Sequence, residues 1–163
     1  MTTFALVPGA WHGAWCFDAF AAELERRGHR AVAIDLPVED TSAGVSTYAR
    51  VVVDALADVP DDVVLAGHSL GGLTIPVVAA LRPLRRLVFV CGLLPHPGLS
   101  FADRPRDEPD VFVPSYADEI VRDKTARDEL GRSHWTDSEA AVRVLYGDCR
   151  REDALNAVAR LRP

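Results

Sequence analysis

The sequence has few cysteines, no long apolar run and no histidine after His134. Its three cysteines, Cys16, Cys91 and Cys149, are an odd number without C-x-x-C spacing, a pattern that fits free thiols better than a disulfide scaffold or a zinc site. The amino-terminal apolar run is shorter than a secretory signal and far below the about 20 residues of a membrane span. We therefore expect a cytoplasmic protein that holds no metal and enters no membrane.

Basic residues are scattered and outnumbered by acidic ones. The chain has 18 Lys and Arg residues against 24 Asp and Glu residues, which gives a net charge of −6. Binding to nucleic acid requires a concentrated basic face. No nucleic-acid partner is therefore expected.

Four short apolar segments predict the strands of a sheet. They are continuous rather than alternating in hydrophobicity, which is typical of strands covered on both faces. Their ranges are residues 4–7, 31–34, 63–66 and 87–90. Helical periodicity separates them, so the fold class is α/β: a mainly parallel sheet flanked by helices.

Three helices are predicted between these strands. They cover residues 17–24, 48–56 and 70–81. Gly28 stands where a C-terminal cap of the first helix belongs, and Ser46 or Thr47 is available as N-cap of the second. Pro76 conflicts locally with the third helix, because proline lacks an N–H and its ring clashes with the preceding turn.

The character of the sequence changes from Leu94 onwards. Several prolines are followed by helical stretches at residues 117–130, 138–146 and 152–161. We divide the chain into a core, residues 1–94, and a mostly helical insertion of the same domain, residues 95–163. Residues 141–148 allow a second interpretation, a strand that ends in Asp148. The segment from Ser138 favours a helix, because it is typical of a helix start.

The segment Gly67-His68-Ser69-Leu70-Gly71 matches the pattern G-x-S-x-G between an apolar strand and a helix. A serine here occupies a sharp, strained turn that raises its hydroxyl above the sheet, and the glycines remove side chains that would collide with backbone. The helix that begins at Leu70 directs free N–H groups at the site, where negative charge develops on an attacked carbonyl. We predict Ser69 as a nucleophile and the Leu70 N–H as an oxyanion donor. The alternative is a glycine-rich turn with a capping serine.

The loop after the first strand supports this site. Residues 8–15 read P-G-A-W-H-G-A-W. A loop at the end of an adjacent strand is where an acyl-transfer site places its second oxyanion donor, so the Ala10 N–H is expected to act with that of Leu70. Gly9 lets the backbone approach a substrate closely. The alternative is a tight loop in which Trp11 packs into the core.

These segments together resemble the α/β-hydrolase superfamily, closest to its small esterase and hydroxynitrile-lyase-like branch. The resemblance is carried by residues 6–15, 33–37, 67–72 and 87–92, and more weakly by residues 148–149 and 159–163. It implies a cofactor-independent serine hydrolase that acts on a small ester or related acyl compound, with residues 95–163 forming a cap. Pro8 departs from the pattern, because many relatives have histidine before the oxyanion glycine.

Several side chains are expected to contact the substrate. They are Gly9, Trp11, His12, His68 and His134. His134 lies in the expected cap beside Trp135. For His68 a packing role competes with substrate binding, since its side chain should point away from the neighbouring serine.

The resemblance also implies a catalytic acid and then a histidine, each after a further strand. We expect these last strands to lie outside the 163 residues. His96 could act as a substitute base, but its flanking prolines suggest a surface loop. Asp35 ends the second strand and is expected to cap a loop. The edge of strand 87–90 would then lie open, which invites self-association or a partner chain.

Functions from different classes stay open. The first is a serine hydrolase that forms an acyl-enzyme on Ser69, and a hydroxynitrile-lyase-type enzyme could use the same groups. The second is a catalytically impaired binding or interaction module that keeps the fold but lacks the base. A dinucleotide-binding domain is disfavoured, because residues 9–13 do not match G-x-G-x-x-G and Trp11 would crowd a pyrophosphate.

Overall fold

The structure is a computed structural model that describes residues 1–103 and 124–163. The chain forms two compact units, Met1–Pro95 and His96–Pro163. The first unit holds the predicted strands and the turn at Ser69. Among the helices of the described ranges, none is long and apolar enough to cross a membrane.

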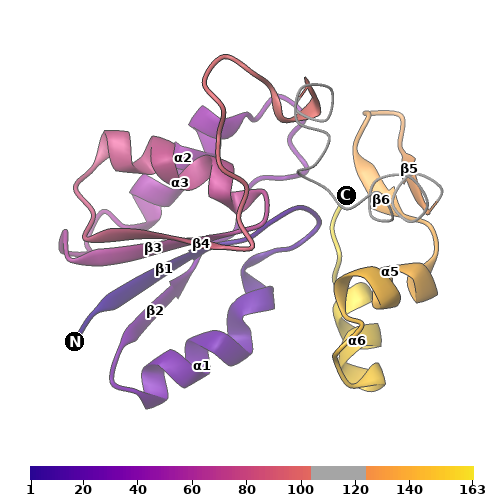
Figure 1. Ribbon diagram of the computed structural model, residues 1–163, viewed down its shortest axis with the longest axis horizontal. Coiled ribbons are helices and arrows are strands. Elements are labelled where there is room, and N and C mark those ends of the chain that lie inside the picture. The colour runs from indigo at the N-terminus through magenta and orange to yellow at the C-terminus, as the bar shows by residue number, and fades with distance from the viewer. Residues whose placement is uncertain (104–123) are drawn as a thin grey trace. The chain divides into compact units, whose positions relative to one another are not determined.

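A four-stranded parallel sheet in the order β2-β1-β3-β4 forms the centre of the first unit (Figure 1). Its strands are β1 (Thr3–Val7), β2 (Arg30–Ala33), β3 (Val63–His68) and β4 (Arg86–Val90). The parallel sheet and the four predicted strands are thus confirmed. Val7 lies opposite Gly67, and His68 lies opposite Val90. The loops that leave β1, β3 and β4 therefore begin side by side at one edge of the sheet.

Helices cover both faces of this sheet. Helix α1 (Asp18–Arg26) lies on one face, and helices α2 (Val45–Ala55) and α3 (Gly71–Leu81) lie on the other (Figure 1). A short 3₁₀ helix, η1 (Ala14–Phe17), leads into α1. The alternation of side chains along β1 explains this arrangement: Ala5 and Val7 belong to the core under α2 and α3, whereas Leu6 packs with Leu24 of α1.

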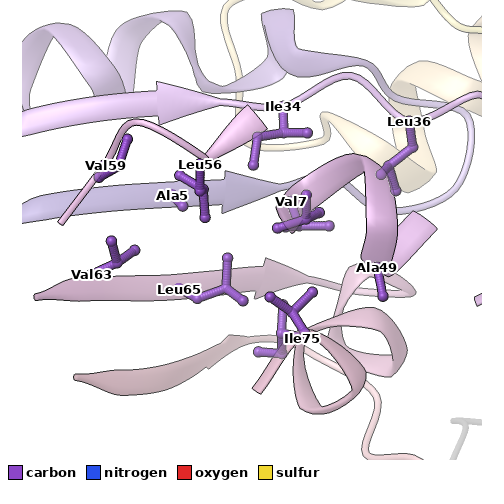
Figure 2. Close-up of a cluster of buried hydrophobic side chains, with 12 residues drawn as sticks. Ala5, Val7, Ile34, Leu36, Ala49, Leu56, Val59, Val63, Leu65 and Ile75 are labelled. Atoms are coloured by element: carbon purple, nitrogen blue, oxygen red, sulfur yellow. The ribbon is translucent and has the colours of Figure 1, made fainter. Parts of the chain in front are cut away.

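The larger hydrophobic core lies between the sheet and helices α2 and α3 (Figure 2). Val52 of α2, Leu65 of β3 and Ile75 of α3 are fully buried in it. Burial of each such side chain stabilises the fold by about 1.5–3 kcal/mol relative to exposure. Helix α3 continues through Pro76 without a break. The core therefore holds α3 against β3, and with them the turn that carries Ser69.

The predicted helix caps have different outcomes. Gly28 follows α1 with a φ of +79°, and its N–H donates to a carbonyl of the last turn, so the predicted C-terminal cap is confirmed. The predicted N-cap of α2 is wrong, because Gly44 takes that position. The backbone changes from extended at Gly44 to helical at Val45, which places Ser46 and Thr47 inside the first turn.

The second unit contains two strands and two α-helices in its described part. They are β5 (Thr125–Arg127), β6 (Ser133–Trp135), α5 (Ser138–Leu145) and α6 (Arg151–Val158), after a short 3₁₀ helix η2 (Phe101–Asp103). Helices α5 and α6 confirm the predicted helices, and the strand interpretation of residues 141–148 is wrong. Asp137 explains the start of α5, because its carboxylate accepts a hydrogen bond from the Ala140 N–H at 3.0 Å.

The helix predicted at residues 117–130 is not formed by residues 124–130, the part of it that the structure describes. Residues 117–123 lie outside the described residues, and from there the chain forms β5 and a tight turn into the antiparallel strand β6. The carboxylate of Asp128 accepts a hydrogen bond from the Arg132 N–H at 2.9 Å, and Gly131 has a φ of +79°. These local bonds favour a hairpin over a helix. In its described residues the second unit therefore contains a hairpin as well as helices α5 and α6.

Candidate active site

Ser69 lies between β3 and α3 with a backbone φ of +50°. A left-handed angle costs a non-glycine residue about 1–2 kcal/mol, so neighbouring groups must hold the turn. The Ser69 N–H donates to the Val90 carbonyl at 3.2 Å, and the Leu93 N–H donates to the Ser69 carbonyl at 3.0 Å. The end of β4 and the loop after it thus hold the strained residue on both sides. Sequence reasoning missed this role of the loop, whose one signal is Gly92, two residues after the strand.

Gly67 and Gly71 allow backbone segments to approach closely around Ser69. A Cβ atom on Gly67 would lie 2.7 Å from the carbonyl oxygen of Gly71, and one on Gly71 would lie 2.6 Å from that of Val7. The obstructing atoms are backbone atoms, which cannot rotate away as a flexible side chain can. The spacing of the two glycines therefore has a steric cause, because α3 begins directly against the end of β1.

The loop after β1 touches the side chain of Ser69. A Cβ atom on Gly9 would lie 2.7 Å from Cβ and 3.3 Å from Oγ of Ser69. The backbone of Gly9 therefore passes directly over the serine, and Ala10 follows as the next residue. The structure brings together the loop and the turn that the sequence had singled out separately.

Two backbone N–H groups beside Ser69 are available to a ligand. Within residues 1–103 and 124–163, neither the Ala10 N–H nor the Leu70 N–H donates a hydrogen bond to another protein group. Leu70 is the N-cap residue of α3, where the first N–H groups have no partner inside the helix and carry its positive partial charge. Both groups are thus suited to bind an oxygen that carries negative charge.

His12 and His68 lie next to each other near this turn. Their ring centroids are 6.2 Å apart with nearly perpendicular planes, and the His12 ring also stacks on Trp15 at 5.4 Å. Burial lowers the pKa of His12 below its ordinary value. Burial lowers the pKa of His68 as well, and repulsion from the protonated form of His12 lowers it further. Both rings are therefore neutral near pH 7 and introduce no cation beside Ser69.

Asp35 caps the loop after β1 from the neighbouring strand. Its carboxylate accepts a hydrogen bond from the Ala14 N–H at 2.8 Å, at the start of η1. The expected capping role of Asp35 is therefore confirmed. The bond links the end of β2 to the loop that carries Gly9 and Ala10.

Two other histidines, His96 and His134, belong to the second unit. His134 lies half-buried on β6, opposite Ala126, and is not among the residues that the first unit brings to Ser69. His96 is exposed, and its Nδ1 atom lies 3.4 Å from the carbonyl oxygen of Pro97. In the described part of the chain, no hydrogen bond joins Ser69 Oγ to a histidine, and no group of three or more His, Cys, Asp or Glu side chains could hold a metal ion.

A parallel α/β sheet with a strained serine between a strand and a helix defines a class of protein, and comparison with known families identifies it. Residues 4–163 match the alpha/beta hydrolase family. The chain belongs to this family. The resemblance found in the sequence is thereby confirmed.

Esterases are among the relatives of the chain. The carbendazim hydrolyzing esterase of Nocardioides sp. is 37% identical over 108 residues, which are 60% of this chain and 45% of that protein. Methylesterase 3 of Arabidopsis thaliana is 33% identical over 136 residues, which are 76% of this chain and 47% of that protein. The chain thus spans about half the length of these curated relatives.

Solved structures show the same fold. Polyneuridine aldehyde esterase has a TM-score of 0.73 at 22% identity, over 100% of this chain and 69% of that one. A pyrethroid hydrolase from Sphingobium faniae has a TM-score of 0.73 at 27% identity, over 93% of this chain and 63% of that one. Both structures are longer than this chain, and they support the fold that the first unit displays.

Proposed function

We propose that this chain carries the nucleophile and oxyanion hole of an esterase-like serine hydrolase that cleaves a small ester or related acyl compound. Ser69 Oγ attacks the acyl carbon and forms a new C–O bond, while the Ala10 and Leu70 N–H groups bind the developing oxyanion. Collapse of this intermediate expels the alcohol, which takes up a proton, and water then hydrolyses the acyl-enzyme. The contact of the Gly9 backbone with the side chain of strained Ser69 carries the proposal.

The proposed step needs no cofactor but does need a base for the serine proton. No described histidine is hydrogen-bonded to Ser69 Oγ, so no base is assigned within this chain. Loss of the base from a serine hydrolase costs on the order of 10³-fold or more in rate, while an oxyanion hole alone retains some catalysis. Weak but measurable reactivity of Ser69 is therefore expected from these residues alone.

Four residues from the loop and turn around Ser69 are proposed to line the substrate site: Gly9, Trp11, His12 and His68. A small ester is favoured because the names of several relatives denote esterases and methylesterases. Neutral histidines and an indole suit an uncharged substrate better than an anionic one.

A fluorophosphonate probe tests the proposal, because it reacts with serines that attack an electrophile held in an oxyanion hole. The purified chain should carry one adduct on Ser69, located by mass spectrometry of peptides, and Ser69→Ala should not be labelled. Ser42→Ala is the matched control, since Ser42 donates to the Asp40 carboxylate at 2.6 Å but has no such turn. A folded chain in which Ser69 stays unlabelled would refute the hydrolase proposal.

A binding module is the second candidate. It is favoured because, in residues 1–103 and 124–163, no histidine is hydrogen-bonded to Ser69 Oγ. Such a module would bind the same small acyl compounds without converting them. Unchanged ligand recovered after prolonged incubation with an unlabelled Ser69 would support this candidate.

The open edge of β4 is proposed as a site of association with another strand. Among the strands of the described residues, β4 pairs with β3 alone, and Phe89 and Val90 are 36% and 43% exposed. An exposed apolar edge strand presents unpaired N–H and carbonyl groups to a second polypeptide. Association is expected to involve this edge rather than β2, which ends the sheet on the other side.

A further inference from the structure

His12 makes a hydrogen bond that the mechanism above does not use. The side chain is only 7% exposed, and its Nδ1 atom lies 2.7 Å from the carbonyl oxygen of Ala10. A carbonyl oxygen can only accept, so Nδ1 must carry the hydrogen in this bond. The bond connects residue 12 to residue 10 and therefore spans Trp11.

Trp11 is the residue of this loop that needs support. Its φ is +62°, a left-handed angle that is strained for a bulky aromatic residue. A buried hydrogen bond stabilises the conformation in which it forms. The bond from His12 therefore opposes this strain, and it joins the two residues on either side of Trp11.

We propose that His12 is a positioning residue that holds the Ala10 amide at Ser69 through its hydrogen bond to the Ala10 carbonyl. The N–H and the carbonyl of Ala10 share one Cα atom, so a fixed carbonyl restricts the rotation that would turn the N–H away. On the other side of Ala10, Gly9 contacts Ser69. The Ala10 amide is thus positioned from both sides, by the contact of Gly9 with Ser69 and by the hydrogen bond of His12 to the Ala10 carbonyl. This inference rests on the proposed function only in making Ala10 an oxyanion donor.

The His12 ring is itself held in place. It stacks on Trp15 with 30° between the ring planes and meets the edge of His68 at 87°. Trp15 belongs to η1, whose first N–H donates to Asp35. A ring fixed by packing can impose one position on the loop, whereas a mobile surface side chain could not.

Two substitutions separate the hydrogen bond from the packing. In His12→Asn the side-chain amide can donate from nearly the position of Nδ1, whereas His12→Leu fills space without a donor. His29→Leu is the matched control. His29 is also half-buried with a ring contact, to Phe4 at 5.2 Å, but it precedes β2 at the opposite end of the strands.

The first readout is the rate constant for phosphonylation of Ser69. We expect His12→Leu to slow the reaction about 10²-fold, as a displaced oxyanion donor does, while His12→Asn recovers most of the rate and His29→Leu changes nothing. The second readout is alkylation of Ser69→Cys by iodoacetamide, which builds no oxyanion and should not respond to His12→Leu. Equal losses in both reactions, or no rescue by asparagine, would overturn the proposal.

Two measurements remain decisive if Ser69 is unreactive in the parent chain, which would refute the proposed function alone. Nitrogen-15 NMR of the unmutated protein should show a neutral His12 with its hydrogen on Nδ1; a hydrogen on Nε2 contradicts the inference. Hydrogen exchange of the Ala10 amide should accelerate in His12→Leu and stay slow in His12→Asn. Equal exchange in all variants contradicts it as well.

Discussion

Substitution of Gly71 by alanine tests the packing that holds the serine turn against the sheet. The added Cβ would lie 2.6 Å from the Val7 carbonyl oxygen and 2.7 Å from that of Pro8. Ordinary contacts begin near 3.4 Å, so α3 and the end of β1 must move apart by about 0.8 Å. Forced overpacking of this kind costs about 1–3 kcal/mol. The same movement would pull the Leu70 amide away from the loop that carries Ala10.

Urea unfolding and phosphonylation of Ser69 measure the two consequences. Gly71→Ala should lower the free energy of unfolding by about 1–3 kcal/mol and slow phosphonylation by about 10²-fold. Gly44→Ala is the control, because a Cβ there would meet nothing within 4 Å. Because Gly44 is the N-cap of α2 and alanine is a poor N-cap, this substitution should cost about 0.5–1 kcal/mol, with unchanged labelling. If Gly71→Ala is as stable and as reactive as the parent, the close approach of α3 to β1 is not what holds the site.

Three further predictions follow from the loop and the sheet edge. Burial lowers the pKa of His12 and of His68 below the ordinary value of 6.5. The stability that the protein has with both rings neutral is therefore fully present above pH 6.5 and is lost as the pH falls through the pKa values of the folded protein. Urea unfolding should give a lower free energy of unfolding near pH 5 than near pH 7, and this difference should be smaller in His12→Asn. Asp35→Ala removes the acceptor of the Ala14 N–H and should lower the free energy of unfolding by about 1 kcal/mol, with faster hydrogen exchange at Ala14; unchanged exchange would contradict the capping role. Val90→Lys places a charge on the open edge and should lower the apparent mass in light scattering of a self-associated sample, whereas an unchanged mass would exclude this edge as the contact.

The sequence predicted the first unit well because its signals are local and agree with one another. Each strand is a continuous apolar run, and Gly28 ends α1 as expected. The turn at Ser69 is specified by glycines whose close contacts leave little choice. Where the fold and the motif depend on residues that are close together in the chain, they can be predicted from a single sequence.

Predictions failed where distant or competing contacts decide the structure. Residues 124–130 have helical periodicity, but the Asp128 carboxylate binds backbone N–H groups and closes a hairpin turn. The hydrogen bond from the Ser69 N–H to Val90 and the one from the Leu93 N–H to Ser69 depend on β4 pairing beside β3, which no local pattern encodes. The hydrogen bond of His12 likewise depends on the left-handed backbone of Trp11. The sequence does not predict this conformation, because tryptophan rarely adopts it.

A structure of the phosphonylated chain would test the central claim most directly. The account predicts a phosphorus atom bonded to Ser69 Oγ, with the phosphoryl oxygen about 2.7–3.1 Å from both the Ala10 and the Leu70 nitrogen atoms. A phosphoryl oxygen that faces solvent, or that meets neither amide, would contradict the oxyanion hole and the mechanism built on it.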